Sequence, residues 1–149
     1  MKNHTVHHKF LKLIFKYIIL FLFFGFFYFG IECLWRKKLA DWRMGVMGGT
    51  IAVIIGMMNN LFSDDTSFLF QCLFGSILTT LAEAILGTHW QQKGIHIWDY
   101  SALPFSYVNG NINLFFSIAW FFLSGLCIFL DDFIRHLFFH EKMPRYKLR

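Results

Sequence analysis

Long hydrophobic runs alternate with short polar connections along the chain. Four runs of about 20 residues, the length of a membrane-spanning helix, carry at most one charged side chain each: residues 17–35, 44–62, 66–87 and 112–130. At about 1.5 Å rise per residue, such a helix covers roughly the 30 Å hydrocarbon core of a bilayer. The pattern therefore predicts an all-α, polytopic membrane protein with four transmembrane helices. We expect one membrane domain over residues 1–149, ending in a cytoplasmic tail from about residue 131.

Small and polar residues recur within the runs at the spacing of one helix face. They are Gly25, Tyr28, Glu32 and Trp35 or Arg36 in the first run, Gly45, Gly49, Ala52 and Gly56 in the second, Ser76, Thr80, Glu83 and Gly87 in the third, and Asn113, Ser117, Trp120 and Ser124 in the fourth. In lipid, small residues let helices approach closely, and polar side chains bond between helices. The pattern favours interhelical packing, with a polar pathway as the alternative.

The composition supports a membrane location. The chain is 56% hydrophobic and 15% charged, which leaves too little polar surface for a soluble globule. No basic segment alternates with base-stacking aromatic residues, so a nucleic-acid partner is not expected despite the net charge of +5. We expect the lipid bilayer as the surroundings, and a second copy of the chain or other membrane subunits as partners.

The distribution of Lys and Arg predicts the orientation. With four spans, both termini lie on one side, which carries four basic residues before the first run and five in the tail. The opposite side carries five, namely Arg36, Lys37, Lys38, Arg43 and Lys93. Cytoplasmic loops are enriched in Lys and Arg, so both termini are expected in the cytoplasm of a cell-membrane protein. The basic connection after the first run departs from this rule.

Two carboxylates lie inside the runs, Glu32 and Glu83. A charge within a span costs about 2.5–3.5 kcal/mol on insertion scales, which favours a partner, a wet cavity or a neutral, protonated carboxyl group. Arg36 follows Glu32 by one turn and is a candidate partner, and Arg43 is another. Both carboxylates lie near the ends of their runs on the same side of the membrane, so we expect them to share a leaflet. A structural ion pair is favoured, and a substrate or cation site and acid–base catalysis are the alternatives.

The connection at residues 88–111 is rich in aromatic residues. Trp98 and Tyr100 are expected to anchor it at the bilayer interface, while Asp99 or Ser101 caps a turn and Pro104 sets the chain direction. The predicted candidate polar site consists of Glu32, Arg36, Glu83, Trp98, Asp99, Tyr100 and Ser101.

No motif predicts an enzyme, a cofactor or a catalytic residue, and an intramembrane enzyme is a remote alternative. His136 and His140 are spaced to share a helix face, but no third metal ligand is evident, so no metal site is expected. Asp131 and Asp132 are expected to mark the boundary with water at the inner end of the fourth run. The three cysteines, Cys33, Cys72 and Cys127, are expected to pack as small apolar residues.

Several longer motifs resemble one known family. They are IECLWR at 31–36, Gly48 and Gly49 with the apolar run to Asn59, the region of Glu83 and Gly87, WDYSALPF at 98–105, the Gly110 turn, FSIAWFFLS at 116–124, LDD at 130–132 and EKMPRYKL at 141–148. Together they resemble the short four-span form of the membrane proteins described as putative ABC-transporter type IV, from about Tyr28 to Leu148.

The resemblance implies a permease-like transport subunit and indicates no substrate. The alternative is a non-transporting scaffold or partner subunit whose polar stripes only pack helices. The chain departs from the family pattern in two places. Asn60 stands where an acidic residue is expected, and the Leu114–Phe115 pair lacks the proline expected before Phe116 and Ser117.

Overall fold

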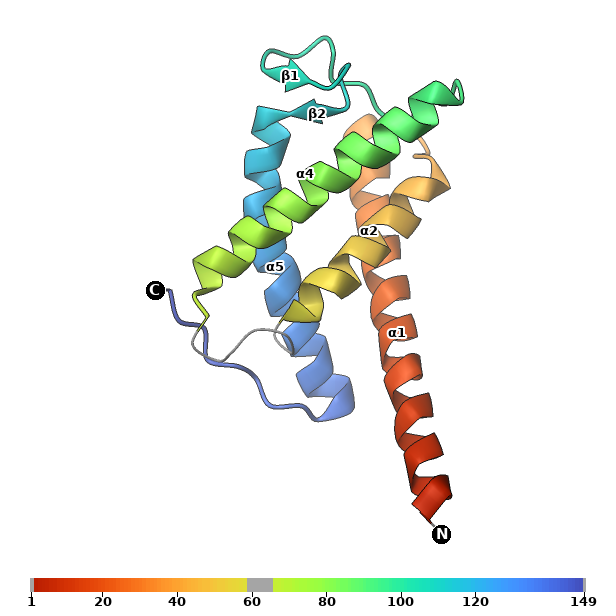
Figure 1. Cartoon of the computed structure of the whole chain (residues 1–149), viewed down its shortest axis with the longest axis vertical. Coiled ribbons are helices and arrows are strands. Elements are labelled where there is room, and N and C mark those ends of the chain that lie inside the picture. The colour runs from red at the N-terminus through yellow and green to blue at the C-terminus, as the bar shows by residue number, and fades with distance from the viewer. Residues whose placement is uncertain (1, 59–65, 149) are drawn as a thin grey trace. The chain divides into compact units, whose positions relative to one another are not determined.

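The computed structural model describes residues 2–58 and 66–148, with side chains from Phe10 onward. The described residues are mostly helical (Figure 1). In chain order they form α1 (Lys2–Arg36), α2 (Trp42–Gly56), α4 (Phe68–Gln92), β1 (Ser106–Tyr107), β2 (Ile112–Asn113) and α5 (Leu114–Phe139). The sequence did not predict the two short strands, which pair antiparallel with Ser106 opposite Asn113.

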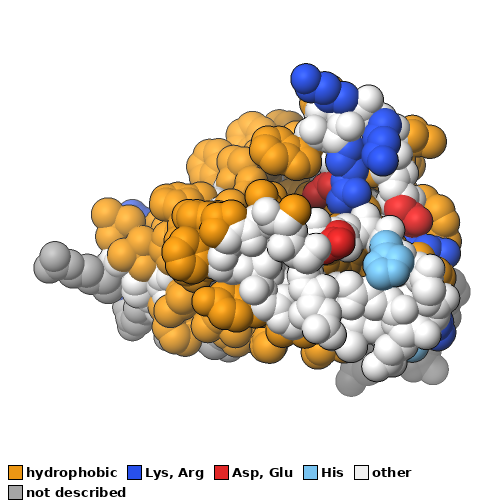
Figure 2. All heavy atoms as spheres, turned by 90° about the horizontal axis from the view of Figure 1, so that it is seen from above, with side chains coloured by type: hydrophobic (Ala, Val, Ile, Leu, Met, Phe, Trp, Pro, Cys, Tyr) orange, Lys and Arg blue, Asp and Glu red, His pale blue; other side chains and the backbone are white. Residues whose placement is uncertain are grey.

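Among the described residues, three helices are long and apolar enough to cross a membrane: Phe10–Arg36 within α1, Phe68–Gln92 and Leu114–Phe139. This confirms a helical, membrane-type protein. At 15 residues, α2 is apolar but short, and the predicted second span reaches residues 59–62, which lie outside the described residues. The count of four spans therefore stays a prediction. Hydrophobic side chains also cover a broad area of the surface in Figure 2, as expected of a chain surrounded by lipid.

The chain forms two compact units. Unit 1 comprises Met1–Gly56 and Asp131–Met143, and unit 2 comprises Met57–Leu130 and Pro144–Arg149. Helix α5 contributes to both, because it continues beyond the predicted end of the fourth span at Leu130 to Phe139. The prediction of a single membrane domain stays a prediction.

In unit 1, α1 and α2 pack through glycines. A Cβ atom at Gly25 would lie 2.9 Å from the carbonyl oxygen of Gly45, and one at Gly49 would lie 2.6 Å from that of Phe21. The small-residue stripe of the second run therefore does what its spacing predicts, since it lets two backbones touch. Asp41 starts α2 as its N-cap, with Oδ1 accepting the backbone N–H of Arg43 at 2.9 Å.

In unit 2, the ends of both helices are held by specific contacts. Helix α4 is followed by Gly94 at φ 72°, a left-handed position that glycine adopts without strain. Helix α5 begins after Asn113, whose Oδ1 accepts the N–H of Phe115 at 2.9 Å. The C-terminal segment returns to the start of α4, where Phe68 donates its N–H to the carbonyl of Lys147 at 2.7 Å.

Candidate functional site

Glu83 lies at the centre of the polar interior of unit 2. Its side chain is 1% exposed, and each carboxylate oxygen accepts a hydrogen bond from an aromatic donor. Tyr100 donates its hydroxyl to Oε1 at 3.1 Å, and Trp120 donates its indole N–H to Oε2 at 3.0 Å. Tyr100 lies in the loop between α4 and α5, and Trp120 lies on α5. The carboxylate on α4 therefore links three parts of the unit.

The polar faces of α4 and α5 continue this contact toward the other end of the helices. Ser76 donates its hydroxyl to the carbonyl of Ser117 at 2.6 Å, and Thr80 donates to the Ser117 hydroxyl at 3.0 Å. The predicted stripes of the third and fourth runs thus face each other. Their bonding confirms the packing interpretation for this pair of helices.

The loop at 96–113 is built around one turn. Asp99 Oδ1 accepts the N–H of Ser101 at 2.8 Å, which confirms the predicted cap by Asp99. The N–H and the side chain of Ser101, with the nearby His96, hold the pKa of the exposed Asp99 carboxyl below its usual value. Tyr100 donates its N–H to the carbonyl of Gly110 at 2.8 Å, which closes the loop beneath the turn.

Trp98 corrects one expectation. It is 5% exposed, and its indole N–H donates to the carbonyl of Asn111 at 3.0 Å. Because the ring is buried inside unit 2, against Trp90 at 5.6 Å between centroids, the predicted anchoring of Trp98 at the bilayer interface is wrong. Tyr100 is half-buried, and its hydroxyl points to Glu83.

Two buried asparagines in this loop were not predicted to carry its structure. Asn111 and Asn113 are both fully buried. Asn111 donates to Gln91 Oε1 at 2.8 Å, and Asn113 donates to the carbonyl of Pro104 at 2.8 Å. Asn113 was named only as the first residue of the polar stripe of the fourth run, and the sequence signal for Asn111 is its place beside the Gly110 turn.

Glu32 forms its predicted ion pair in unit 1. Arg36 Nε lies 2.8 Å from Glu32 Oε2, and the Tyr28 hydroxyl donates to Oε1 at 2.8 Å. The other candidate partner, Arg43, pairs with Asp41 at 3.3 Å. Glu83, Trp98, Asp99, Tyr100 and Ser101 belong to unit 2. The expectation that Glu32 and Glu83 share a leaflet therefore stays a prediction.

A buried ion-pair cluster in unit 1 was missed. Asp131 and Arg135 are 0% and 3% exposed, and Arg135 Nε lies 2.6 Å from Asp131 Oδ2. Arg135 also donates to the carbonyl of Gly56 at 3.2 Å, while Lys16 lies 2.7 Å from Glu141 Oε1. Both Asp131 and Asp132 are buried within the protein, and the expectation that they mark the water boundary stays a prediction. The i, i+4 spacing of Asp131 and Arg135 was the available signal.

The histidine pair of the tail does not share a helix face. Helix α5 ends at Phe139, and His140 follows with a left-handed φ of 56°. Within residues 2–58 and 66–148, no group of three or more His, Cys, Asp or Glu side chains is placed to hold a metal ion.

Comparison with known families shows which family the chain belongs to. Residues 15–146 match the family described as putative ABC-transporter type IV. The chain belongs to this family. The ABC-transporter type IV match includes the Glu32 pair, the Glu83 centre and the Asp131 cluster, and it confirms the resemblance found in the sequence. No curated protein and no solved structure matches the chain.

Proposed function

We propose that the chain is a multi-pass subunit of a transport-type membrane assembly, and that its buried polar groups hold its helices together. The family description supports the transport setting. The bonding of Glu83 supports the structural role, because protein donors occupy both of its oxygens and 1% of the side chain is exposed. A carboxylate whose two oxygens are both hydrogen-bonded by protein donors serves to hold the helices together.

A permease-like subunit is the second candidate, and the family description favours it. In that role Glu32 and Glu83 line a substrate path, and Glu83 exchanges its two aromatic donors for substrate. A catalytic role belongs to neither candidate. Partners for both are the bilayer and either a second copy or other membrane subunits.

The proposed placement is a cell membrane, with four spans and both termini in the cytoplasm. The larger number of Lys and Arg on the side of the termini, four before the first run and five in the tail against five on the opposite side, supports this orientation. Labelling of single cysteines at Lys38 and Lys142 with a membrane-impermeant maleimide, in a background with its native cysteines replaced, tests it. The position at 38 reacts in intact cells and the position at 142 reacts only after lysis. The reverse pattern contradicts the orientation.

Glu83→Gln distinguishes the two functional candidates. The amide places an N–H₂ group against the donor of Tyr100 or Trp120, so under the structural role the variant unfolds in detergent at a lower temperature than the native chain. Unchanged unfolding contradicts the structural role and favours the permease-like subunit.

A further inference from the structure

The turn between α1 and α2 carries the cations that break the expected charge pattern. Arg36 is paired with Glu32 and Arg43 with Asp41, so neighbouring carboxylates offset both guanidinium groups. Lys37 and Lys38 are exposed, and neither has an ion-pair partner among the described side chains. The turn therefore presents two uncompensated ammonium groups.

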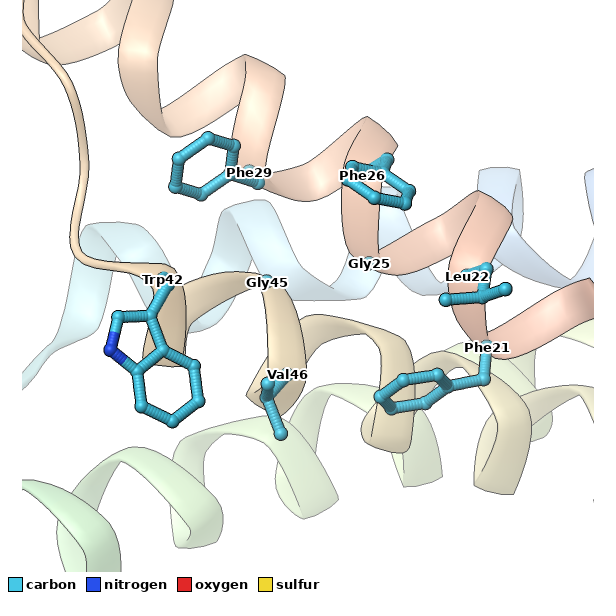
Figure 3. Close-up of a pocket in the computed structure, with 8 residues that line it drawn as sticks. All are labelled: Phe21, Leu22, Gly25, Phe26, Phe29, Trp42, Gly45 and Val46. Atoms are coloured by element: carbon cyan, nitrogen blue, oxygen red, sulfur yellow. The ribbon is translucent and has the colours of Figure 1, made fainter. Parts of the chain in front are cut away.

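An apolar groove lies between the same two helices (Figure 3). Its volume is about 240 Å³, below the roughly 300–1,000 Å³ of typical small-molecule pockets. Figure 3 shows aromatic side chains of α1 facing Trp42 and Val46 of α2, with Gly25 and Gly45 between them. A narrow groove with almost entirely hydrocarbon walls suits a slender hydrocarbon chain.

Trp42 connects the groove to the basic turn. Its indole ring lines the groove, and the guanidinium carbon of Arg43 lies 5.8 Å from the ring centroid. Tryptophan favours the level of lipid headgroups. The lysines at 37 and 38 directly follow the last residue of α1, so the charged and apolar features lie at one end of the same helix pair.

We propose that the turn and groove bind an anionic phospholipid, with its phosphate beside Lys37 and Lys38 and one acyl chain in the groove. Charge complementarity selects this occupant, because two uncompensated cations attract a headgroup with a net negative charge. A zwitterionic headgroup carries no net charge. The site explains why basic residues occur on the proposed non-cytoplasmic side of the membrane, where the orientation rule expects few of them. It does not depend on the proposed transport role.

Lipid titration followed by native mass spectrometry tests the headgroup part. The purified full chain in detergent is titrated with phosphatidylglycerol and with phosphatidylcholine of identical acyl chains. We expect one tightly bound phosphatidylglycerol and weaker binding of phosphatidylcholine. The double variant Lys37→Gln, Lys38→Gln lowers phosphatidylglycerol affinity by about fivefold for each lysine, as expected for roughly 1 kcal/mol per cation. The matched control Lys93→Gln, Lys142→Gln removes two exposed charges elsewhere and leaves the affinity unchanged.

A groove-filling variant tests the acyl-chain part. Val46→Phe places a ring in the groove and lowers the affinity for both lipids, whereas Ile54→Phe, at another exposed position of α2, does not. Equal affinities for the two lipids, or native affinity in the lysine double variant, overturn the proposal. A change in the monomer–dimer ratio of Val46→Phe with unchanged lipid binding also overturns it and assigns the groove to a second copy.

Discussion

The indole N–H of Trp120 donates to the Glu83 carboxylate across 3.0 Å, from α5 to α4. Both side chains are buried in unit 2. A carboxylate of this kind stays in a membrane helix only when its oxygens are satisfied. The contact explains how a chain with few polar residues within its hydrophobic runs retains an acidic one.

Glycine contacts between α1 and α2 predict opposite effects of two alanine substitutions. Gly49→Ala places a Cβ 2.6 Å from the Phe21 carbonyl oxygen, so the helices must separate and the unfolding temperature in detergent falls. Gly30→Ala meets no atom within 4 Å, and it stabilises the helix by about 0.5–1 kcal/mol through higher helix propensity. Equal effects of the two changes would show that the close approach is not needed.

The buried pair in unit 1 predicts a rescue. Arg135→Gln leaves Asp131 buried with no guanidinium partner, which lowers the free energy of unfolding by about 3–5 kcal/mol. Adding Asp131→Asn removes the stranded charge and restores most of that loss. Chemical or thermal unfolding of the three variants in detergent measures both effects, and a double variant no more stable than Arg135→Gln argues against the pairing.

The turn at Asp99 predicts a dependence on pH. Because hydrogen bonds from Ser101 lower its pKa below 3.8 in the folded protein, the ionised carboxyl stabilises the fold at any pH above that value. This stabilisation is lost as the pH falls through the folded pKa. Unfolding temperatures of the native chain and Asp99→Asn, compared between about pH 6 and pH 3, should therefore converge toward the acid end. A constant difference over that range is the contrary result.

The sequence predicted the parts of this structure that follow from helix periodicity. The small and polar stripes ending at Gly87 and Ser124 were expected to pack between helices, and the Glu32–Arg36 pair followed from one helical turn. Trp98 was misplaced because tryptophan is common both at bilayer interfaces and in protein interiors, and composition alone does not distinguish these environments.

The buried ion pairs of unit 1 show a second limit of prediction from the sequence. Lys16 meets Glu141 across 125 positions of the chain, and no local spacing reports such a contact. Asp131 was assigned to water because hydrophobicity ends at Leu130, although α5 continues to Phe139. A polar helix segment covered by another part of the chain has the same sequence pattern as one exposed to solvent.

A double-mutant cycle between Glu83 and Trp120 tests most directly whether the buried polar groups hold the helices together. Glu83→Gln, Trp120→Phe and the combined variant are unfolded in detergent. Contacting residues typically couple by about 0.5–3 kcal/mol, so the cycle should be non-additive. An additive Glu83 cycle, with each single variant as stable as the native chain, would contradict the account.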